Sequence, residues 1–396
     1  MKKPYAAAAP RGLLVFSSLF LTGLALEGVL RVTNPLDLNW RMVQPHPTRI
    51  AALSPNFDGT FKGIRVKTNA FGHRVPTTWE KRYPAAKPPG VMRVVVVGDS
   101  FTFGDEWPAE SSFVEQLQQR LDPDALHIQV LNLGMFGYNP LQEWEVVAHD
   151  VSTFDPDVVI LQFTDANDLI EVIPPDSANV LQRGWMWLRQ HSYLYWAVGD
   201  VWYHGQGSRL RSRILGTAKT SSSRTSDGQA QDQAIHRILR RATRYYQRRY
   251  TSIKRHDRGW IQALESYQRI ARWLAARRIP LIMVIASPNW DLECADWCCR
   301  GMTIHYRETV AAGQPFYATL AREFGALTPD ALSLDTAFGP YTLEELYDGP
   351  TWHYGPTKAS IIADRLLALL QHVGVTSQPH RIGHDGQQTQ SPATDR

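Results

Sequence analysis

The sequence predicts an α/β protein in which helices cover both faces of a parallel β-sheet. Several short, continuous apolar runs, such as Val94–Val97, are typical of strands that are buried on both sides. These runs alternate with segments of helical period instead of following one another through tight turns. Such alternation favours parallel strands joined by helices.

The expected elements follow in chain order. The predicted strands are Val94–Val97, Ile128–Leu133, Val158–Phe163, Pro280–Ala286 and a short one near Ala326–Leu332. The predicted helices are Ser112–Leu121, Tyr138–Val151, Trp260–Arg278 and Thr357–Gln371.

The first 30 residues carry a basic flank followed by an apolar run. Residues 1–11 contain three basic and no acidic side chains, and Gly12–Leu26 contains no charge at all. We therefore predict a cytoplasmic N-terminus and, over residues 12–30, a transmembrane anchor or signal segment, with an uncleaved anchor preferred to cleavage before Leu26. The positive flank predicts that the remainder is exported, to the periplasmic or extracellular side.

The rest of the chain divides by composition. Residues 31–90 are rich in Pro, Gly and Asn and predict an extended arm with some β structure. Residues 91–375 hold the predicted sheet, interrupted by an insertion over 173–258, and residues 376–396 predict a disordered tail. The insertion is rich in Trp and Tyr, and its last part, Gln231–Trp260, has nine Lys or Arg against two acids. That part reads as the solvated face of a helix or, alternatively, as a contact for anionic lipid headgroups or an acidic polymer.

Composition excludes several classes of protein. The chain has 396 residues, 43% apolar and 20% charged, which excludes wholesale disorder. A net charge of +4 is too mild to indicate nucleic-acid binding. The three cysteines, Cys294, Cys298 and Cys299, lack the second ligand pair of a zinc site, so we predict no metal and no cofactor. In an oxidising compartment Cys294 could bridge to either of the other two.

A serine follows the first predicted buried strand. The segment VVVVGDSFTFG, Val94–Gly104, places Ser100 after Gly98 and Asp99, where a turn leads toward a helix. Open α/β folds bind ligands at the carboxyl edge of the sheet, which is where this serine falls. The same three residue types also form ordinary turns, so the segment needs support from elsewhere in the chain.

The next two predicted strands end in groups that can donate hydrogen bonds. Gly134 and Gly137 lie in NLGMFGYN, and a missing Cβ leaves backbone N–H groups open to an oxyanion. Asn167 lies in QFTDANDL and supplies a side-chain amide, although an asparagine there could equally cap a helix.

A histidine stands just before the last predicted helix. His353 lies in YDGPTWHYGPTK, with Asp348 five residues before it. A loop histidine beside an acid is a candidate general base.

Ser, Gly, Asn and His therefore occur in order, and in this arrangement the chain resembles the GDSL-like SGNH hydrolase superfamily over about 92–375. The resemblance implies a flavodoxin-like three-layer α/β/α fold and ester chemistry. It also implies that Ser100 is the nucleophile and His353 the general base. The N–H groups of Ser100 and Gly137, with the Asn167 side chain, would form the oxyanion hole. The upstream segment KTNAFGHR, Lys67–Arg74, is similar to one that precedes the catalytic domain in membrane-anchored members.

Two positions depart from the family pattern. Asp165 replaces the glycine of the third block, and Pro350 stands where the family places the acid three residues before the histidine. Proline cannot orient an imidazole, so we expect Asp348 to do so, or a backbone carbonyl to leave a Ser–His dyad.

These observations predict an exported serine esterase that removes O-acyl groups from an envelope glycan or a related ester. An O-acyltransferase of the same fold is the first alternative, because it would use the same residues. A catalytically silent scaffold or glycan-binding protein is the second, and the Pro350 departure motivates it. The predicted partners are an acylated small molecule or glycan, and the membrane through the N-terminal helix, but no nucleic acid.

Overall fold

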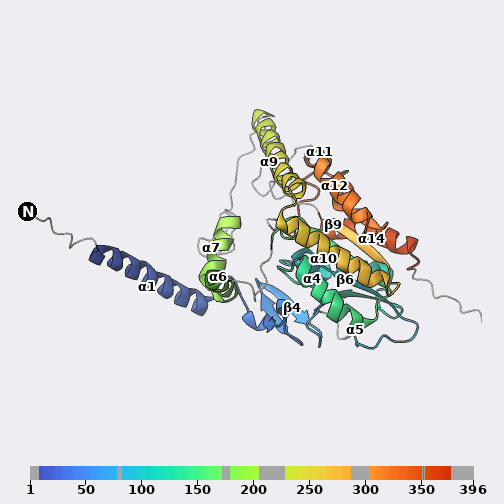
Figure 1. Ribbon diagram of the computed structural model, residues 1–396, viewed down its shortest axis with the longest axis horizontal. Coiled ribbons are helices and arrows are strands. Elements are labelled where there is room, and N and C mark those ends of the chain that lie inside the picture. Colours follow the sequence, from blue (N-terminus) through green and yellow to red (C-terminus); the bar gives the residue numbers. More distant parts are fainter. Residues whose placement is uncertain are drawn as a thin grey trace, which may run out of the picture.

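The centre of the molecule is a five-stranded, fully parallel sheet (Figure 1). The computed structural model describes residues 9–77, 83–171, 179–204, 228–286, 304–349, 351 and 353–375. The strands are β6 (Met92–Val97), β7 (Ile128–Asn132), β8 (Val158–Thr164), β9 (Leu281–Ala286) and β10 (Ala331–Ser333). Their order across the sheet is β10-β9-β8-β6-β7, so the first of the five lies between the second and the third. This is the flavodoxin-like order, and it confirms the predicted fold class.

The strands form where the sequence predicted them because their apolar runs are buried on both faces. Every residue of β7, β8 and β9 is buried, and Val94–Val97 are fully enclosed. The last strand begins at Ala331, later than predicted, because the preceding helix α12 (Gln314–Gly325) ends with Ala326 as its C-cap.

Helices cover both faces of the sheet. The helices of this domain are α2 (Ser100–Phe103), α3 (Phe113–Leu121), α4 (Pro140–Val146), α5 (Ser152–Phe154), α10 (Arg258–Ala275), α11 (Tyr306–Ala311), α12, α13 (Leu334–Phe338) and α14 (Pro356–His372). Helices α4 and α10 pack together in front of the sheet in Figure 1, and α3 packs against α14. The crossovers through α3 and α4 run in opposite directions along the sheet, so right-handed connections put these two helices on opposite faces.

The predicted helix Tyr138–Val151 is a composite. It begins at Pro140, because the Asn139 side chain accepts the Leu141 N–H group and proline fits the first turn. A π-helical turn, Val147–Val151, follows and leads into α5. Periodicity does not reveal such a turn, since it interrupts the hydrogen bonding of a helix without interrupting its apolar stripe.

The N-terminal helix α1 (Ala9–Thr33) projects away from the domain (Figure 1). Its segment Gly12–Thr33 is long and apolar enough to cross a membrane, and its side chains are almost entirely exposed. A core helix of a soluble domain would bury such a face, so α1 matches the predicted N-terminal membrane segment.

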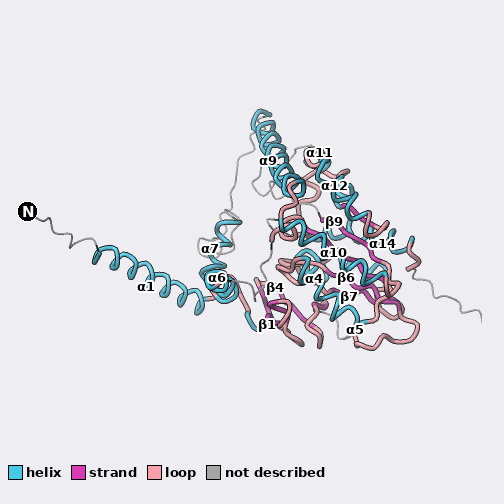
Figure 2. Tube along the Cα trace, in the orientation of Figure 1, coloured by secondary structure: helices cyan, strands magenta, loops and turns pink. Residues whose placement is uncertain are grey.

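Residues 31–90, expected to form an extended arm with some β structure, do contain strands but fold back onto the domain that holds the main sheet. They form a hairpin of β1 (Val43–His46) and β2 (Ile50–Leu53) and a second sheet of β3 (Asp58–Phe61), β4 (Ile64–Thr68) and β5 (Arg74–Val75). Figure 2 shows these strands beside the main sheet. Their apolar residues, including Met42, Leu53, Phe61 and Val66, belong to the same core as the main sheet. Burial of these few side chains in the domain core explains why the segment is not extended.

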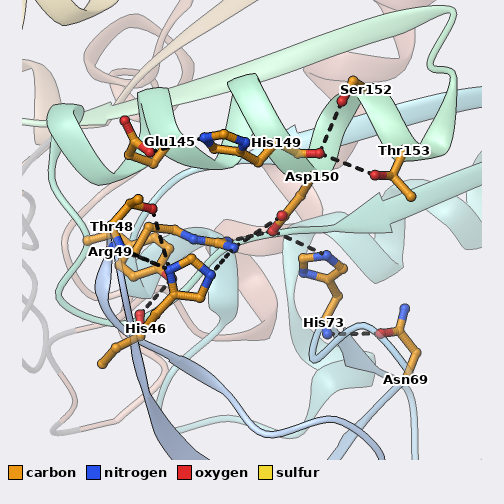
Figure 3. A network of polar contacts seen from close by, with 12 residues as sticks. His46, Thr48, Arg49, Asn69, His73, Glu145, His149, Asp150, Ser152 and Thr153 are labelled. Atoms are coloured by element: carbon orange, nitrogen blue, oxygen red, sulfur yellow. Dashed lines mark hydrogen bonds and ion pairs between the residues drawn. The ribbon is translucent and has the colours of Figure 1, made fainter.

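A polar network joins this arm to the π-helical turn (Figure 3). Asp150 accepts two hydrogen bonds from the Arg49 guanidinium, at 2.5 and 3.1 Å, and lies 3.7 Å from His73 Nε2. Arg49 also contacts His46 at 2.8 Å. Arg49 and His73 are both buried, so the network fixes the arm against the domain in a setting that excludes most water.

We expect His73 to make the folded state sensitive to acid. Burial lowers the pKa of His73 from 6.5 to about 4, with the Asp150 carboxylate opposing and the Arg49 cation reinforcing this effect. The unfolded chain therefore binds more protons between these pH values, and stability falls as the pH drops through them. The loss is up to about 3 kcal/mol.

Urea unfolding in detergent between pH 7 and pH 4 measures this effect. His73→Gln should show a smaller loss of stability with acid than the unchanged chain. His127→Gln, which changes an exposed histidine, should follow the unchanged chain. Equal acid dependence in the His73 variant and the unchanged chain would contradict the assignment.

In the part of the insertion that the structure describes lie the helices α6 (Val180–His191), α7 (Tyr193–His204) and α9 (Gly228–Lys254). The aromatic residues interleaved with the basic ones on α9 face inward: Tyr246 is buried, and its hydroxyl lies 3.0 Å from that of Tyr317. One face of this basic helix is therefore covered by the domain. The three cysteines, Pro350 and the tail 376–396 lie outside the described residues.

Candidate active site

Ser100 begins the short helix α2, directly beyond the carboxyl end of β6. Asp99 caps this helix, since its Oδ1 accepts the Phe101 N–H group at 2.9 Å. Gly98 precedes them, and a Cβ there would lie 2.3 Å from Thr102 Oγ1. The turn thus requires glycine at 98 and leaves Ser100 partly exposed at the sheet edge.

The other end of this helix is held by Arg74 from the arm. Its guanidinium donates hydrogen bonds to the carbonyls of Phe103, Gly104 and Trp107 at 2.6–2.7 Å. Helix ends leave carbonyls without intrahelical partners, and Arg74, which is buried, donates to the two at this end, Phe103 and Gly104. Burial lowers the pKa of Arg74 to about 10, so it stays charged at neutral pH. The segment Lys67–Arg74 therefore supports the turn that carries Ser100.

The loop after β7 lies against this turn. Met135 N–H donates to the Gly98 carbonyl at 3.2 Å, and a Cβ on Gly134 would lie 2.5 Å from the Phe103 nitrogen. Gly137 has φ +76°, a left-handed conformation that favours glycine. The fold therefore requires glycine at both positions, at 134 for close packing and at 137 for the backbone conformation. These glycines allow the loop to pack against the turn that carries Ser100.

Asn167 follows β8 and joins the same edge. Its Nδ2 donates to the Tyr138 carbonyl at 2.9 Å, which ties it to the turn at Gly137. The neighbouring Asp168 accepts hydrogen bonds from Thr164 N–H and the Tyr267 hydroxyl at 2.7 and 2.8 Å. The structure therefore brings the candidate oxyanion residues of the second and third blocks together.

Buried carboxyl groups lie beneath this edge. Burial raises the pKa of Asp99, and it raises the pKa of Glu143 and of Asp168 well above the ordinary value. The charge of Asp168 adds to the effect on Glu143, and the charge of Asp99 adds to the effect on Asp168. The cluster consequently retains protons at pH values where exposed carboxyl groups have lost theirs.

His353 lies beside the serine turn and contacts a carboxylate that the sequence reasoning missed. Its ring lies 5.1 Å from the ring of Phe101, the residue after Ser100. Its Nδ1 lies 3.1 Å from Oε2 of Glu106, whose side chain is only 4% exposed. Glu106 follows α2 by three residues and has φ +70°, in the left-handed region. The acidic pair Asp105–Glu106, directly after the serine block, was the available signal in the sequence.

The structure places Asp348, the expected partner of His353, in another role. Its two carboxylate oxygens accept the Thr357 N–H group at 3.1 and 3.2 Å, and one accepts the Thr357 hydroxyl at 2.5 Å. Its side chain also packs against Gly355, where a Cβ would lie 2.2 Å from that of Asp348. Asp348 thus caps the start of α14, and Glu106 is the carboxylate at His353 Nδ1.

Asp105, next to Glu106, is held by the arm. Lys62 Nζ lies 2.5 Å from Asp105 Oδ2, and both side chains are largely buried. Burial opposes ionisation of Asp105, yet the Lys62 cation keeps the pKa of this carboxyl below its ordinary value. This ion pair fixes the loop from which Glu106 reaches His353.

Asp165, which stands where the SGNH pattern has a glycine, contacts the insertion. Burial raises the pKa of Asp165 to about 6, while Arg249 and the hydroxyl of Tyr245, both on α9, act in the opposite direction. Arg249 also donates to the Ala166 carbonyl at 3.3 Å. The departure from the family pattern is therefore an attachment point for α9.

Comparisons with known proteins give low overall similarity. No protein-family model and no curated protein matches the chain. Among solved structures, TesA shares 10% identity over 71% of this chain and 99% of its own, with a TM-score of 0.35. The acetyl xylan esterase AlAXEase shares 13% over 70% and 98%, with a TM-score of 0.34. A variant of Axe2, an acetyl xylan esterase from Geobacillus stearothermophilus, shares 14% over 72% and 95%, with a TM-score of 0.32.

The chain's own geometry matches what its resemblance to SGNH hydrolases implied for the fold. The strand order is flavodoxin-like, and three of the four blocks follow the carboxyl ends of β6, β7 and β8. The fourth, with His353, lies against the first through Phe101 and Glu106. The four blocks therefore gather at one edge of the sheet.

Proposed function

We propose that the protein is a serine esterase in which Ser100, His353 and Glu106 act together. The contact between His353 Nδ1 and Glu106, beside the turn that begins with Ser100, is the observation that carries this proposal. A buried carboxylate at Nδ1 holds the neutral imidazole in the tautomer whose Nε2 can accept a proton. It also stabilises the imidazolium that forms when that proton is taken.

The reaction follows from these roles. His353 accepts the proton of the Ser100 hydroxyl as the oxygen attacks an ester carbonyl. The N–H groups of Ser100 and Gly137 and the Asn167 amide donate to the developing oxyanion. One such donor typically stabilises the transition state by about 2.7–4 kcal/mol. The imidazolium then protonates the departing alkoxide, which leaves as an alcohol. Water, deprotonated by His353, releases the acid from the acyl-enzyme.

The substrate class we propose is an O-acyl ester of an envelope glycan or a related molecule, met on the exported side of the membrane. Two features support this setting. A helix long and apolar enough to cross a membrane lies near the N-terminus, and basic residues precede it. Positive flanks remain in the cytoplasm, so the catalytic domain would lie on the opposite side.

Labelling with a charged, membrane-impermeant fluorophosphonate tests both the chemistry and the side of the membrane. Intact cells should label the full chain at Ser100, and Ser100→Ala should abolish the label. The same variant should lower hydrolysis of an aryl acetate by at least about 10³-fold, because the nucleophile is lost.

A neighbouring serine supplies the control. Ser111→Ala should keep both the label and the hydrolysis. Labelling that appears only after cell lysis would place the domain in the cytoplasm. Equal hydrolysis by the Ser100 variant and the unchanged chain, with no adduct at Ser100, would exclude the enzyme and favour the catalytically silent scaffold. An acyl-sugar product without free acid, when a glycan acceptor is supplied, would identify a transferase instead of a hydrolase.

A further inference from the structure

Helices α6 and α7 are fastened to the end of the membrane helix. Glu27, near the end of α1, accepts hydrogen bonds from Ser192 Oγ and from the N–H groups of Tyr193 and Leu194 at 2.8–3.1 Å. These amides open α7, where helix N–H groups have no partner of their own. Arg31 pairs with Glu27 at 2.7 Å and donates to the His191 carbonyl at the end of α6. A carboxylate within an apolar segment needs such partners, which puts the α6–α7 junction at the membrane boundary.

The same junction is held from the other side by the arm, residues 31–90. The Tyr193 hydroxyl donates to the Leu38 carbonyl at 3.1 Å, and the ring of Trp40 lies 6.0 Å from that of Tyr193. The Lys62 ammonium lies 5.8 Å from the ring centre of Trp196. Helix α7 is therefore wedged between α1 and the arm, and its position relative to both is fixed by several independent contacts.

Helix α6 turns an apolar stripe outward. Val180, Leu181, Gly184, Trp187 and Leu188 recur at helical spacing, and all five are exposed. Leu181 is 85% exposed. In a soluble domain, the apolar side chains of an amphipathic helix face the core and are buried.

Helix α7 adds Val198 and Val201, also exposed. The apolar side chains at the end of α1, such as Leu26 and Val29, are exposed as well. Figure 1 shows α6 and α7 beside that end of α1. The apolar surface of the pair is thus continuous with the segment that crosses the bilayer.

We infer that α6 and α7 form a foot that lies in the interfacial layer of the membrane, with their exposed apolar side chains among the lipid acyl chains. Tyr and Trp side chains are favoured at this depth, where one end of the ring is apolar and the other is wet. The partner of this surface is the phospholipid bilayer, because the surface continues α1. Through Lys62 and Asp105 the foot also connects to the loop of Glu106, so it holds the catalytic edge near the bilayer.

Photocrosslinking of the full chain in vesicles of phosphatidylethanolamine and phosphatidylglycerol tests the inference. Benzoylphenylalanine is placed singly at Leu181 or Val198, at Phe20 within α1, and at Leu126. Leu126 is the matched control, since it is 57% exposed, like Val198, but lies just before the amino end of β7. Ser100 and the other site residues lie at the carboxyl ends of the strands, the opposite end of the sheet. After irradiation, lipid should be attached at Leu181, Val198 and Phe20 at about ten times the level at Leu126.

Each other outcome overturns the inference. Lipid at Phe20 but only the Leu126 level at Leu181 and Val198 would mean that the foot stands clear of the bilayer. Crosslinks from these two positions to a second copy or to another protein would identify a protein interface. Absence of lipid at Phe20 would remove the membrane helix on which the inference depends. Circular dichroism of each variant establishes folding, and none of these readouts depends on esterase activity.

Discussion

Glu106→Gln is expected to lower kcat/KM for ester hydrolysis by about 10²- to 10⁴-fold, mainly through kcat. The glutamine amide can donate to His353 Nδ1, which favours the tautomer with the proton on Nε2, where it cannot accept the Ser100 proton. The variant also removes the charge that stabilises the imidazolium. Glu106→Asp should restore part of the activity.

Asp348→Asn is the informative comparison for this experiment. Asp348 caps α14, so its variant should lose about 1 kcal/mol of stability and retain most of kcat. A larger loss of kcat in Asp348→Asn than in Glu106→Gln would return the acid's role to the residue that the sequence suggested.

Arg74→Met should destabilise the folded chain by about 3–5 kcal/mol. The substitution removes donors from the carbonyls of Phe103, Gly104 and Trp107. The Gly104 carbonyl keeps the Trp107 N–H group as a donor at 3.3 Å, whereas those of Phe103 and Trp107 lose the guanidinium on which they depend. The loss should appear as a lower midpoint of urea unfolding. It should also lower kcat, because the helix that begins at Ser100 would lose its support.

Arg65→Met controls for loss of an arginine from the arm. Arg65 pairs with Asp58 at 2.9 Å on the exposed surface, so its replacement should leave the unfolding midpoint nearly unchanged. Arg74→Lys should recover only part of the stability, because one ammonium cannot reproduce the fork of the guanidinium. Equal midpoints for Arg74→Met and Arg65→Met would contradict the proposed support of α2.

The sheet could be predicted from the sequence because its strands are apolar on both faces. The runs Val94–Val97 and Val158–Phe163 are continuously apolar, so a strand formed by either must be covered on both faces, and only the centre of the sheet provides this. The position of Ser100 followed from the end of such a run. The packing of the arm could not be predicted in this way, since its apolar residues are few and widely spaced and find partners only in the folded domain.

The carboxylate partner of His353 could not be predicted from the spacing of residues in the sequence. Family pattern directed attention to residues just before the histidine, yet Glu106 lies 247 positions away in the chain. Its approach depends on the left-handed turn at Glu106 and on the Lys62–Asp105 ion pair, and neither leaves a periodic signal. Likewise, the contacts of Asp165 with Tyr245 and Arg249 depend on the packing of α9, which lies about 80 positions further along the chain and has no counterpart in local spacing.

The attachment of α9 at Asp165 has a consequence for the lineage of this protein. A gene that lost the insertion but kept this aspartate would encode a carboxyl group stripped of both Tyr245 and Arg249. Selection should therefore tie the two traits together. Among proteins related to this one by descent, those with aspartate at position 165 are expected to have a long insertion, and those with glycine there a short one.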